Sequence, residues 1–447
     1  MPIRRRCWRC CAGWPWARWR AGGRGEPQPS PTVRPWRVRT GSRSPRHSRR
    51  SVNRSSVLSG HSRPALFEGG TAMDMTTTAG SAGHIARSRG GFLRLLRLSI
   101  SSHSIYLALI AAYYAGFLTL YHFRPDIAPS NFWDVALGFT IFSVPMMIFG
   151  LAIMRLYHVA VHIKPERPLP ALIKDIGAYL SNPVRLAHGL PMVFIMVMFM
   201  YVFVELKASI PLLNPYSWDQ ALDHADRVLH FGTYPWEWLQ PILGYAPITF
   251  AINVNYSIWF AVMWIVWVYF AFLETDSLIR TRFFLTFFTA WIIGGGLMAI
   301  WFSSMGPCFY GRIGLTPDPY AGLMDYLRQA NETVPIWAVA VQDLLWQGYN
   351  GDQLVEGISA MPSMHNGTAL LFVLAAFRVN RLMGWILAVH GGLIFIGSTV
   401  LAWHYAVDGY VAAALVLGLW WLMAPVSRWW HGQAAHAEFA EAISPGR

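Results

Sequence analysis

The chain has 447 residues, of which 54% are hydrophobic and only 13% are charged. Soluble domains carry about 25% charged residues, so this composition excludes an ordinary soluble protein and favours a membrane protein with several spans. The net charge of +13 arises in residues 1–72, which hold sixteen arginines and two glutamates. The rest of the chain is close to neutral, so no nucleic-acid partner is expected for the folded part.

Residues 1–92 are rich in Arg, Pro, Ser and Gly and show no apolar periodicity, which predicts a disordered basic tail. They also lack the apolar core of a signal peptide. Met73 and Met75 stand directly before the polar leader to the first span. Residues 1–72 are therefore expected to be either an over-extended gene start or a real basic cytoplasmic tail.

Eight apolar segments follow, and a helix needs about 20 residues to cross a bilayer. We therefore predict an all-α polytopic membrane protein with about eight transmembrane helices. Two accessory spans lie in residues 93–163, a six-helix catalytic domain occupies 164–430, and 431–447 form a cytoplasmic tail. The predicted spans are 104–123, 132–156, 189–204, 247–273, 283–304, 363–377, 383–402 and 407–424.

Lysine and arginine are distributed unevenly between the two sets of flanks. Fourteen lie on one side and five on the other, which the positive-inside rule assigns to the cytoplasmic and outer sides. Both termini are then cytoplasmic in a cell-membrane protein, and residues 164–188 are expected to form an interfacial helix on that side. The five cations on the outer side are Arg124, Lys207, Arg227, Arg312 and Arg328.

Two long segments, 214–246 and 305–360, lie on the outer side, and three consecutive glycines lie in the fifth span. Residues 305–360 lead directly into Pro362 and are expected to form a lid or a headgroup pocket. Asp223, Asp226 and His230 follow an i, i+3, i+7 spacing, which is more typical of a solvated helix face than of a metal site. The three glycines at 294–296 indicate close packing or a kink in the fifth span.

Two short clusters carry the chemistry: Pro362–His365, and His404 with Asp408. The histidines are 39 positions apart, which fits one helix across the bilayer, a turn and a helix back, so both emerge at the same outer face. Asp408 follows His404 by four residues and shares its helix face. One histidine can attack phosphorus while the other protonates the leaving oxygen, so the pattern favours phosphoryl transfer.

These clusters resemble two signatures of the type 2 phosphatidic acid phosphatase superfamily. Its second signature contains Pro-Ser-x-His, matched by Pro362–His365, and its third ends in His-x-x-x-Asp, matched by His404 and Asp408. The resemblance covers roughly residues 164–428. It implies that His404 is the nucleophile, that Asp408 supports it, and that His365 is the general acid.

Two departures from the family pattern indicate which branch of the superfamily the chain resembles. No Lys and Arg-Pro motif precedes Pro362, and Gly397 and Ser398 stand where the third signature begins with Ser-Arg. The forms Ala-Met-Pro-Ser-x-His and His-Tyr-x-x-Asp are more similar to the inositol phosphorylceramide synthase branch, which moves a phosphoryl headgroup from one lipid to an acceptor alcohol. Residues 306–312 resemble the outer loop of that branch.

The missing family cations leave the phosphate to be bound by other groups. Arg312 is the predicted clamp, because a guanidinium holds two phosphate oxygens at once. Ser363 is expected to cap its helix or to donate to phosphate, and the two roles are compatible. Tyr310, in the same loop as Arg312, and Asn255, near the outer end of the fourth span, are expected to bind the substrate. No metal or cofactor is expected, because arginine and backbone donors can neutralise the charge.

The sequence thus predicts a lipid phosphotransferase of the inositolphosphotransferase kind, acting through a phosphohistidine at the extracytoplasmic leaflet. Its partners would be a lipid phosphate donor and an alcohol or water acceptor. A lipid phosphate or pyrophosphate phosphatase with the same site is the alternative, since the two differ only in whether water resolves the intermediate. A non-catalytic lipid transporter is a third hypothesis, and it requires polar residues along several spans rather than at one face.

Overall fold

The computed structural model describes residues 89–443, except 126, 128, 274, 276 and 352–356. All of these belong to one compact unit, Met73–Arg447. Within the described residues the secondary structure is helical and contains no strand, so the prediction of an all-α polytopic membrane protein is confirmed. The predicted disordered tail, residues 1–92, lies outside the described range up to residue 88. Its last four residues are wrongly assigned to the tail, because α2 (Arg89–Ser102) begins at Arg89.

Seven described helical segments are long and apolar enough to cross a membrane. Seven of the eight predicted spans therefore have the required length. The remaining one, predicted at 363–377, forms α15 (Met364–Val379), whose 16 residues are fewer than the roughly 20 that a full crossing needs. The seven segments are Ser104–Phe123 (α3), Phe132–Ile163 (α4 with η2), Pro183–Leu213 (α6), Ala246–Ala271 (α9 and α10), Leu278–Trp301 (α11, η3 and α12), Arg381–Val400 (α16) and Ala406–His431 (α17).

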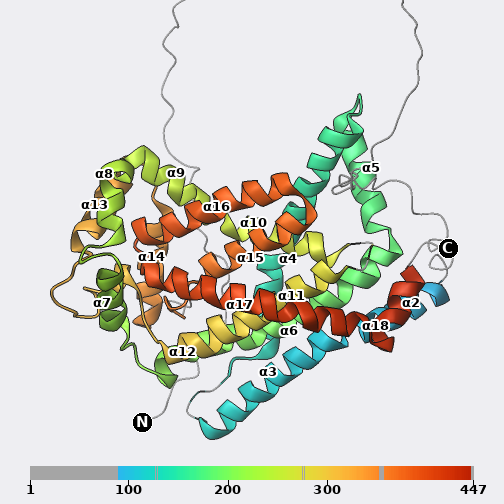
Figure 1. The fold of residues 1–447 in the computed structure, drawn as a ribbon, viewed down its shortest axis with the longest axis horizontal. Coiled ribbons are helices and arrows are strands. Elements are labelled where there is room, and N and C mark those ends of the chain that lie inside the picture. The colour runs from blue at the N-terminus through green and yellow to red at the C-terminus, as the bar shows by residue number, and fades with distance from the viewer. Residues whose placement is uncertain are drawn as a thin grey trace, which may run out of the picture. The chain divides into compact units, whose positions relative to one another are not determined.

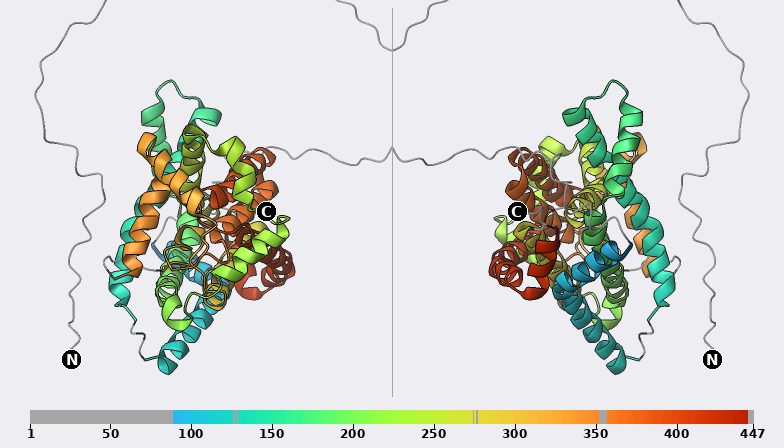
Figure 2. Two further views of the ribbon diagram at one scale, coloured as in Figure 1. Left: turned by 90° about the vertical axis from the view of Figure 1, so that its left-hand side faces the viewer. Right: turned by 90° about the vertical axis from the view of Figure 1, so that its right-hand side faces the viewer.

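The short helices gather at the ends of this bundle (Figure 1). α7, α8, α13 and α14 lie together at one end, whereas α2 and α18 lie at the other. α5 and the end of α4 form a hairpin that projects beyond the neighbouring helices (Figures 1 and 2), and Arg155 of α4 binds Asp175 of α5 through two hydrogen bonds of 2.6 and 2.7 Å. The bounds are α5 (Pro168–Leu180), α7 (Asp219–Leu229), α8 (Pro235–Leu243), η4 (Pro307–Phe309), α13 (Ala321–Thr333), α14 (Trp337–Tyr349) and α18 (Ala434–Ile443).

α15 and α16 form a closely packed hairpin. It turns at Asn380, whose side-chain oxygen accepts a hydrogen bond from Met383 N and so caps α16. α17 packs against α15, and α11 packs against both. This antiparallel arrangement brings the start of α15, the end of α16 and the start of α17 to the same end of the bundle.

The glycines at 294–296 lie in η3 (Trp291–Met298), a π-helical stretch inside the fifth span. A Cβ atom on Gly294 would lie 2.9 Å from Met364 Sδ, and one on Gly295 would lie 2.9 Å from the Phe203 ring. The predicted close packing is therefore confirmed. It allows the first residue of α15 to approach the fifth span.

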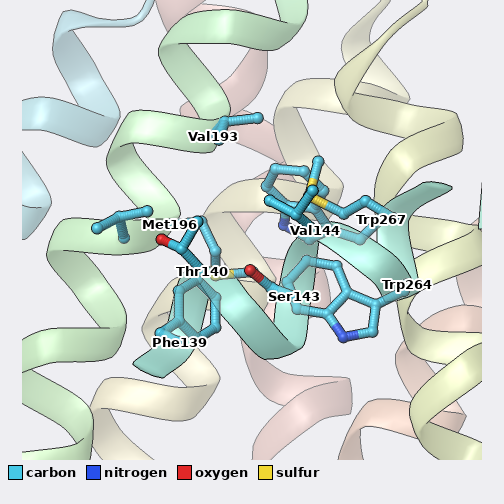
Figure 3. Close-up of a pocket in the computed structure, with 10 residues that line it drawn as sticks. Phe139, Thr140, Ser143, Val144, Val193, Met196, Trp264 and Trp267 are labelled. Carbon is cyan, nitrogen blue, oxygen red and sulfur yellow. The ribbon is translucent and has the colours of Figure 1, made fainter. Parts of the chain in front are cut away.

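A small cavity of about 30 Å³ lies between α4, α6 and α10 (Figure 3). Its lining is mainly apolar, with Trp264 and Trp267 on one side and Met196 on another, and none of the predicted site residues contributes to it. A void of this size holds about one water molecule. It is a packing defect among the spans rather than a substrate pocket.

Replacing Gly295 with Ala should lower the melting temperature of the detergent-solubilised protein. The new methyl group would overlap the Phe203 ring, and overpacking of this kind typically costs about 1–3 kcal/mol. Gly392→Ala is the matched control, because a Cβ atom there meets no other atom within 4 Å. Equal melting temperatures for Gly295→Ala and the wild type would contradict the close packing.

Candidate active site

Ser363 joins the two predicted motifs. It is fully buried and is the N-cap of α15, where its Oγ accepts from Asn366 N at 3.5 Å. Its own backbone N donates to the carbonyl oxygen of Asp408 at 3.1 Å. The helix start that carries His365 is therefore bonded directly to the first turn of α17.

His404 lies in the loop between α16 and α17, and its backbone N donates to Ser398 O at 2.9 Å. Its Nδ1 lies 2.9 Å from the carbonyl oxygen of Ala360 and 3.4 Å from Oδ2 of the buried Asp408. Both neighbours are acceptors, so they favour the tautomer with the proton on Nδ1. Nε2 then keeps its lone pair, as a nucleophile requires.

The two histidines meet as their spacing predicts. The ring centroids of His365 and His404 are 6.2 Å apart, a separation that one phosphoryl group can bridge. Against His365 lie the rings of Tyr256, stacked at 4.8 Å, and of Trp259, at 4.2 Å. Aromatic side chains therefore line one side of the site and hold this imidazole in place, while the ring remains partly accessible.

Residues 220–422 match the family model described as the PAP2 superfamily. This match contains both histidine clusters and most of α7. It supports the type 2 phosphatidic acid phosphatase superfamily, and with it a membrane enzyme of the phosphatase or phosphotransferase class that acts on lipid phosphates. No curated protein and no solved structure matches the chain in the comparisons made.

The predicted substrate-binding residues have partners within the protein. Asn255 lies with Oδ1 2.9 Å from His390 Nδ1, so its amide is already bonded, and its neighbour Tyr256 is the residue that touches His365. Tyr310 is buried in an aromatic cluster, 5.7 Å from the Tyr320 ring. Burial raises the pKa of Tyr310, which keeps its hydroxyl protonated and able to donate.

Arg312 forms an ion pair with Asp343. Its guanidinium also lies 5.9 Å from the Phe309 ring centroid and 5.7 Å from that of Trp346. A carboxylate therefore already neutralises the cation predicted to hold phosphate. To bind a substrate, Arg312 would first have to leave Asp343.

Lys207 is a cation near His365 to which the sequence pattern assigned no role in binding phosphate. It lies on α6, and its charge acts on His365. The segment leading to Pro362 packs against it, since a Cβ atom on Gly357 would lie 2.9 Å from Lys207 Cγ. No carboxylate of the described residues pairs with it. The signal was present in the sequence, because a lysine inside an apolar helix is costly and usually functional.

The expectation of a solvated face on α7 is wrong. Asp219, Asp223, Asp226 and His230 are all at least nine-tenths buried, because this face packs against α17 and the loop after the fifth span. Burial raises the pKa values of the three carboxyl groups, and the hydrogen bonds that they accept oppose this shift. Among the described residues, no group of three His, Cys, Asp or Glu side chains could hold a metal ion.

A second buried polar cluster lies at the opposite end of the bundle. Arg280 Nη2 is 2.9 Å from His103 Nε2 and 3.2 Å from the carbonyl oxygen of His188, and Arg280 Nε donates to Phe270 O at 2.9 Å. Buried polar groups are therefore present at both ends of the bundle. These contacts join α3, α6, α10 and α11, so the cluster stabilises the packing of these helices.

Proposed function

We propose that the protein is a membrane-embedded lipid phosphotransferase that works through a phosphohistidine on His404. The observation that carries this proposal is the orientation of His404. Its Nδ1 faces two acceptors, Ala360 O and Asp408 Oδ2, while a second imidazole lies 6.2 Å away. Such a pair supplies a nucleophile and a separate proton donor to the same phosphoryl group.

In the first step, Nε2 of His404 attacks the phosphorus of a lipid phosphate ester. A P–N bond forms as the P–O bond to the departing alcohol breaks, and His365 gives a proton to the leaving oxygen. In the second step, an acceptor hydroxyl gives its proton to His365 while its oxygen attacks phosphorus and the P–N bond breaks. Asp408 stabilises the positive charge on the ring of His404 in both steps.

The phosphoryl oxygens need positive charge close to His365. Lys207 is our first candidate, since it acts electrostatically on His365 and lacks a carboxylate partner among the described residues. The opening motif of the family has a Lys followed further along the chain by Arg-Pro. Lys207 and Pro215 match its Lys and its Pro, and Asn214 stands in the place of its Arg. The backbone N–H groups at the start of α15 add to this charge. Arg312 is the second candidate.

Transfer to an alcohol is favoured over hydrolysis by two features. Tyr256 and Trp259 form an apolar wall beside the partly accessible His365 ring, which suits a lipid acceptor. Ser398, which stands where the phosphatase signature has Arg, is fully buried and bonded to Asn366, so it offers no cation to a free phosphate group. An inositolphosphotransferase-like reaction at the extracytoplasmic leaflet fits these features and the distribution of Lys and Arg. A lipid phosphate phosphatase with the same three residues is the alternative.

The purified protein should transfer labelled phosphoryl headgroup from a phosphoinositide to an acceptor lipid in mixed micelles. Quenching in alkaline detergent should trap label on His404 in an acid-labile, base-stable form, detectable by peptide mass spectrometry. His404→Gln should lower both signals by about a thousandfold or more without unfolding the protein, because it removes the attacking nitrogen. Label released only as inorganic or water-soluble phosphate, with the acceptor lipid unlabelled, would instead support the phosphatase.

Asp408→Asn should lower kcat by about a hundredfold and change KM by less than about threefold. The carboxylate stabilises charge that develops on His404 only in the transition state, whereas its distance from the lipid leaves binding intact. Initial rates over a range of substrate concentrations measure both constants. A rise in KM with kcat unchanged would contradict this role for Asp408.

Lys207→Ala should lower kcat/KM more than Arg312→Ala does. Loss of a cation next to a phosphoryl group in a dry site typically costs about 3 kcal/mol, which is about a hundredfold in rate. Arg312 is neutralised by Asp343, so its removal is expected to cost less. Arg328→Ala is the control, since Arg328 is half-exposed and pairs with Asp325 on its own helix. If Arg312→Ala is the more damaging change, Arg312 is the phosphate clamp.

A further inference from the structure

We propose that Asp226, together with Asp219, is a positioning residue for His404. The buried acidic face of α7 holds the segment Tyr405–Val407 and thereby sets the direction in which the His404 ring points. This inference rests on the proposed function of His404. It concerns carboxylates whose spacing in the sequence suggests only a solvated face or a metal site.

Asp226 caps a helix to which it does not belong. Its Oδ2 accepts from Ala406 N and its Oδ1 accepts from Val407 N, both at 2.8 Å. These are the first two N–H groups of α17, which have no partner within their own helix. A negative charge at a helix N-terminus is also stabilised by the helix dipole. Asp226 therefore fixes the backbone two residues after His404.

Asp219 holds the other side of the same segment. Its Oδ1 accepts from the Tyr405 hydroxyl at 2.9 Å and from Gly306 N at 2.8 Å, and its Oδ2 accepts from Met305 N at 2.9 Å. Gly306 has a φ of +98°, and a Cβ atom there would lie 2.7 Å from the carbonyl oxygen of Trp403. The loop that Asp219 fixes is thus in direct contact with the residue before His404.

A third contact continues along α17. His230, at the C-terminal end of α7, lies with Nε2 3.0 Å from the Tyr410 hydroxyl. Three side chains therefore bind three successive parts of the chain. Asp219 binds Tyr405, Asp226 binds Ala406 and Val407, and His230, the C-cap of α7, binds Tyr410. The face is nearly closed to solvent, and the carboxylates of Asp219 and Asp226 are satisfied mainly by this segment and the 305–306 loop.

The consequence for catalysis follows from the position of His404. Its backbone is fixed before it by the bond to Ser398 O and after it by α7. If the second anchor loosens, the ring can still occupy the site, but Nε2 points at phosphorus for a smaller fraction of the time. Small losses of alignment lower the rate of attack strongly and affect binding of the lipid little.

The test compares Asp226→Asn with Asp223→Asn in the full-length protein in detergent. The amide introduced at position 226 retains one acceptor oxygen and turns an N–H donor toward the second backbone N–H. We expect a drop in kcat and in the rapid-quench rate of phosphohistidine formation of about tenfold or more, with KM changed by less than about twofold. Asp223→Asn is the matched control, because Asp223 is also buried on the same helix but accepts from Tyr320 Oη rather than from α17. Its rates should stay within about threefold of the wild type.

Tyr405→Phe is a second, milder variant that removes one hydroxyl and its bond to Asp219. It should lower the rate of phosphohistidine formation severalfold while the melting temperature changes little, and it provides the test if Asp226→Asn does not fold. Wild-type rates in the folded Asp226→Asn and Tyr405→Phe variants would overturn the inference. So would an equal loss in Asp223→Asn, which would show a general effect of buried charge. A wild-type protein that forms no phosphohistidine would overturn the proposed function itself.

Discussion

The hydrogen bond from Ser363 N to the carbonyl oxygen of Asp408 is the constraint on which the site depends. It joins the first turn of α15 to the first turn of α17, so the two histidines cannot separate without breaking it. The carbonyl oxygen of Ala360, three residues before Ser363, is in turn the nearest acceptor for Nδ1 of His404. One short stretch of extended chain before α15 therefore fixes the position of one imidazole and the tautomer of the other.

The rest of the structure supports this stretch from several sides. Ala360 N donates to Ser304 O, and Met361 N donates to Ser304 Oγ, which ties the stretch to the end of the fifth span. The glycines of η3 let Met364 approach that same span, and Gly357 lets the chain pass close to Lys207. Small residues at these positions are therefore explained by close approach of the backbone rather than by flexibility.

Polar groups are buried at both ends of the bundle, but the two ends use them differently. At one end, Arg280 donates to the carbonyl oxygens of Phe270 and His188 and lies within hydrogen-bond distance of His103 Nε2. At the other, Asp408 Oδ1 and the hydroxyl of Tyr256 are buried and have no hydrogen-bond partner among the described residues, in the part of the protein that also holds His365 and His404. Unpaired buried polar atoms are costly, and others occur along the spans, such as the indole nitrogens of Trp264 and Trp267, so they do not by themselves mark a binding site.

The sequence by itself determined the helical architecture and the direction of its main hairpin, because apolar runs near 20 residues and the turn between two of them leave few alternatives. It also predicted that His365 and His404 meet, since two crossings return the chain to the same face. The expectation that His404 and Asp408 share a helix face is wrong, because α17 begins at Ala406, and the contact between them is made from the loop before that helix. Only the tertiary structure decided the environment of the charged side chains. Asp343 neutralises Arg312, Lys207 stands without a carboxylate among the described residues, and α7 turns its acidic face toward α17. Residue spacing cannot reveal such pairings, because an amphipathic helix has the same pattern whether its polar face meets water or the unpaired N–H groups of another helix.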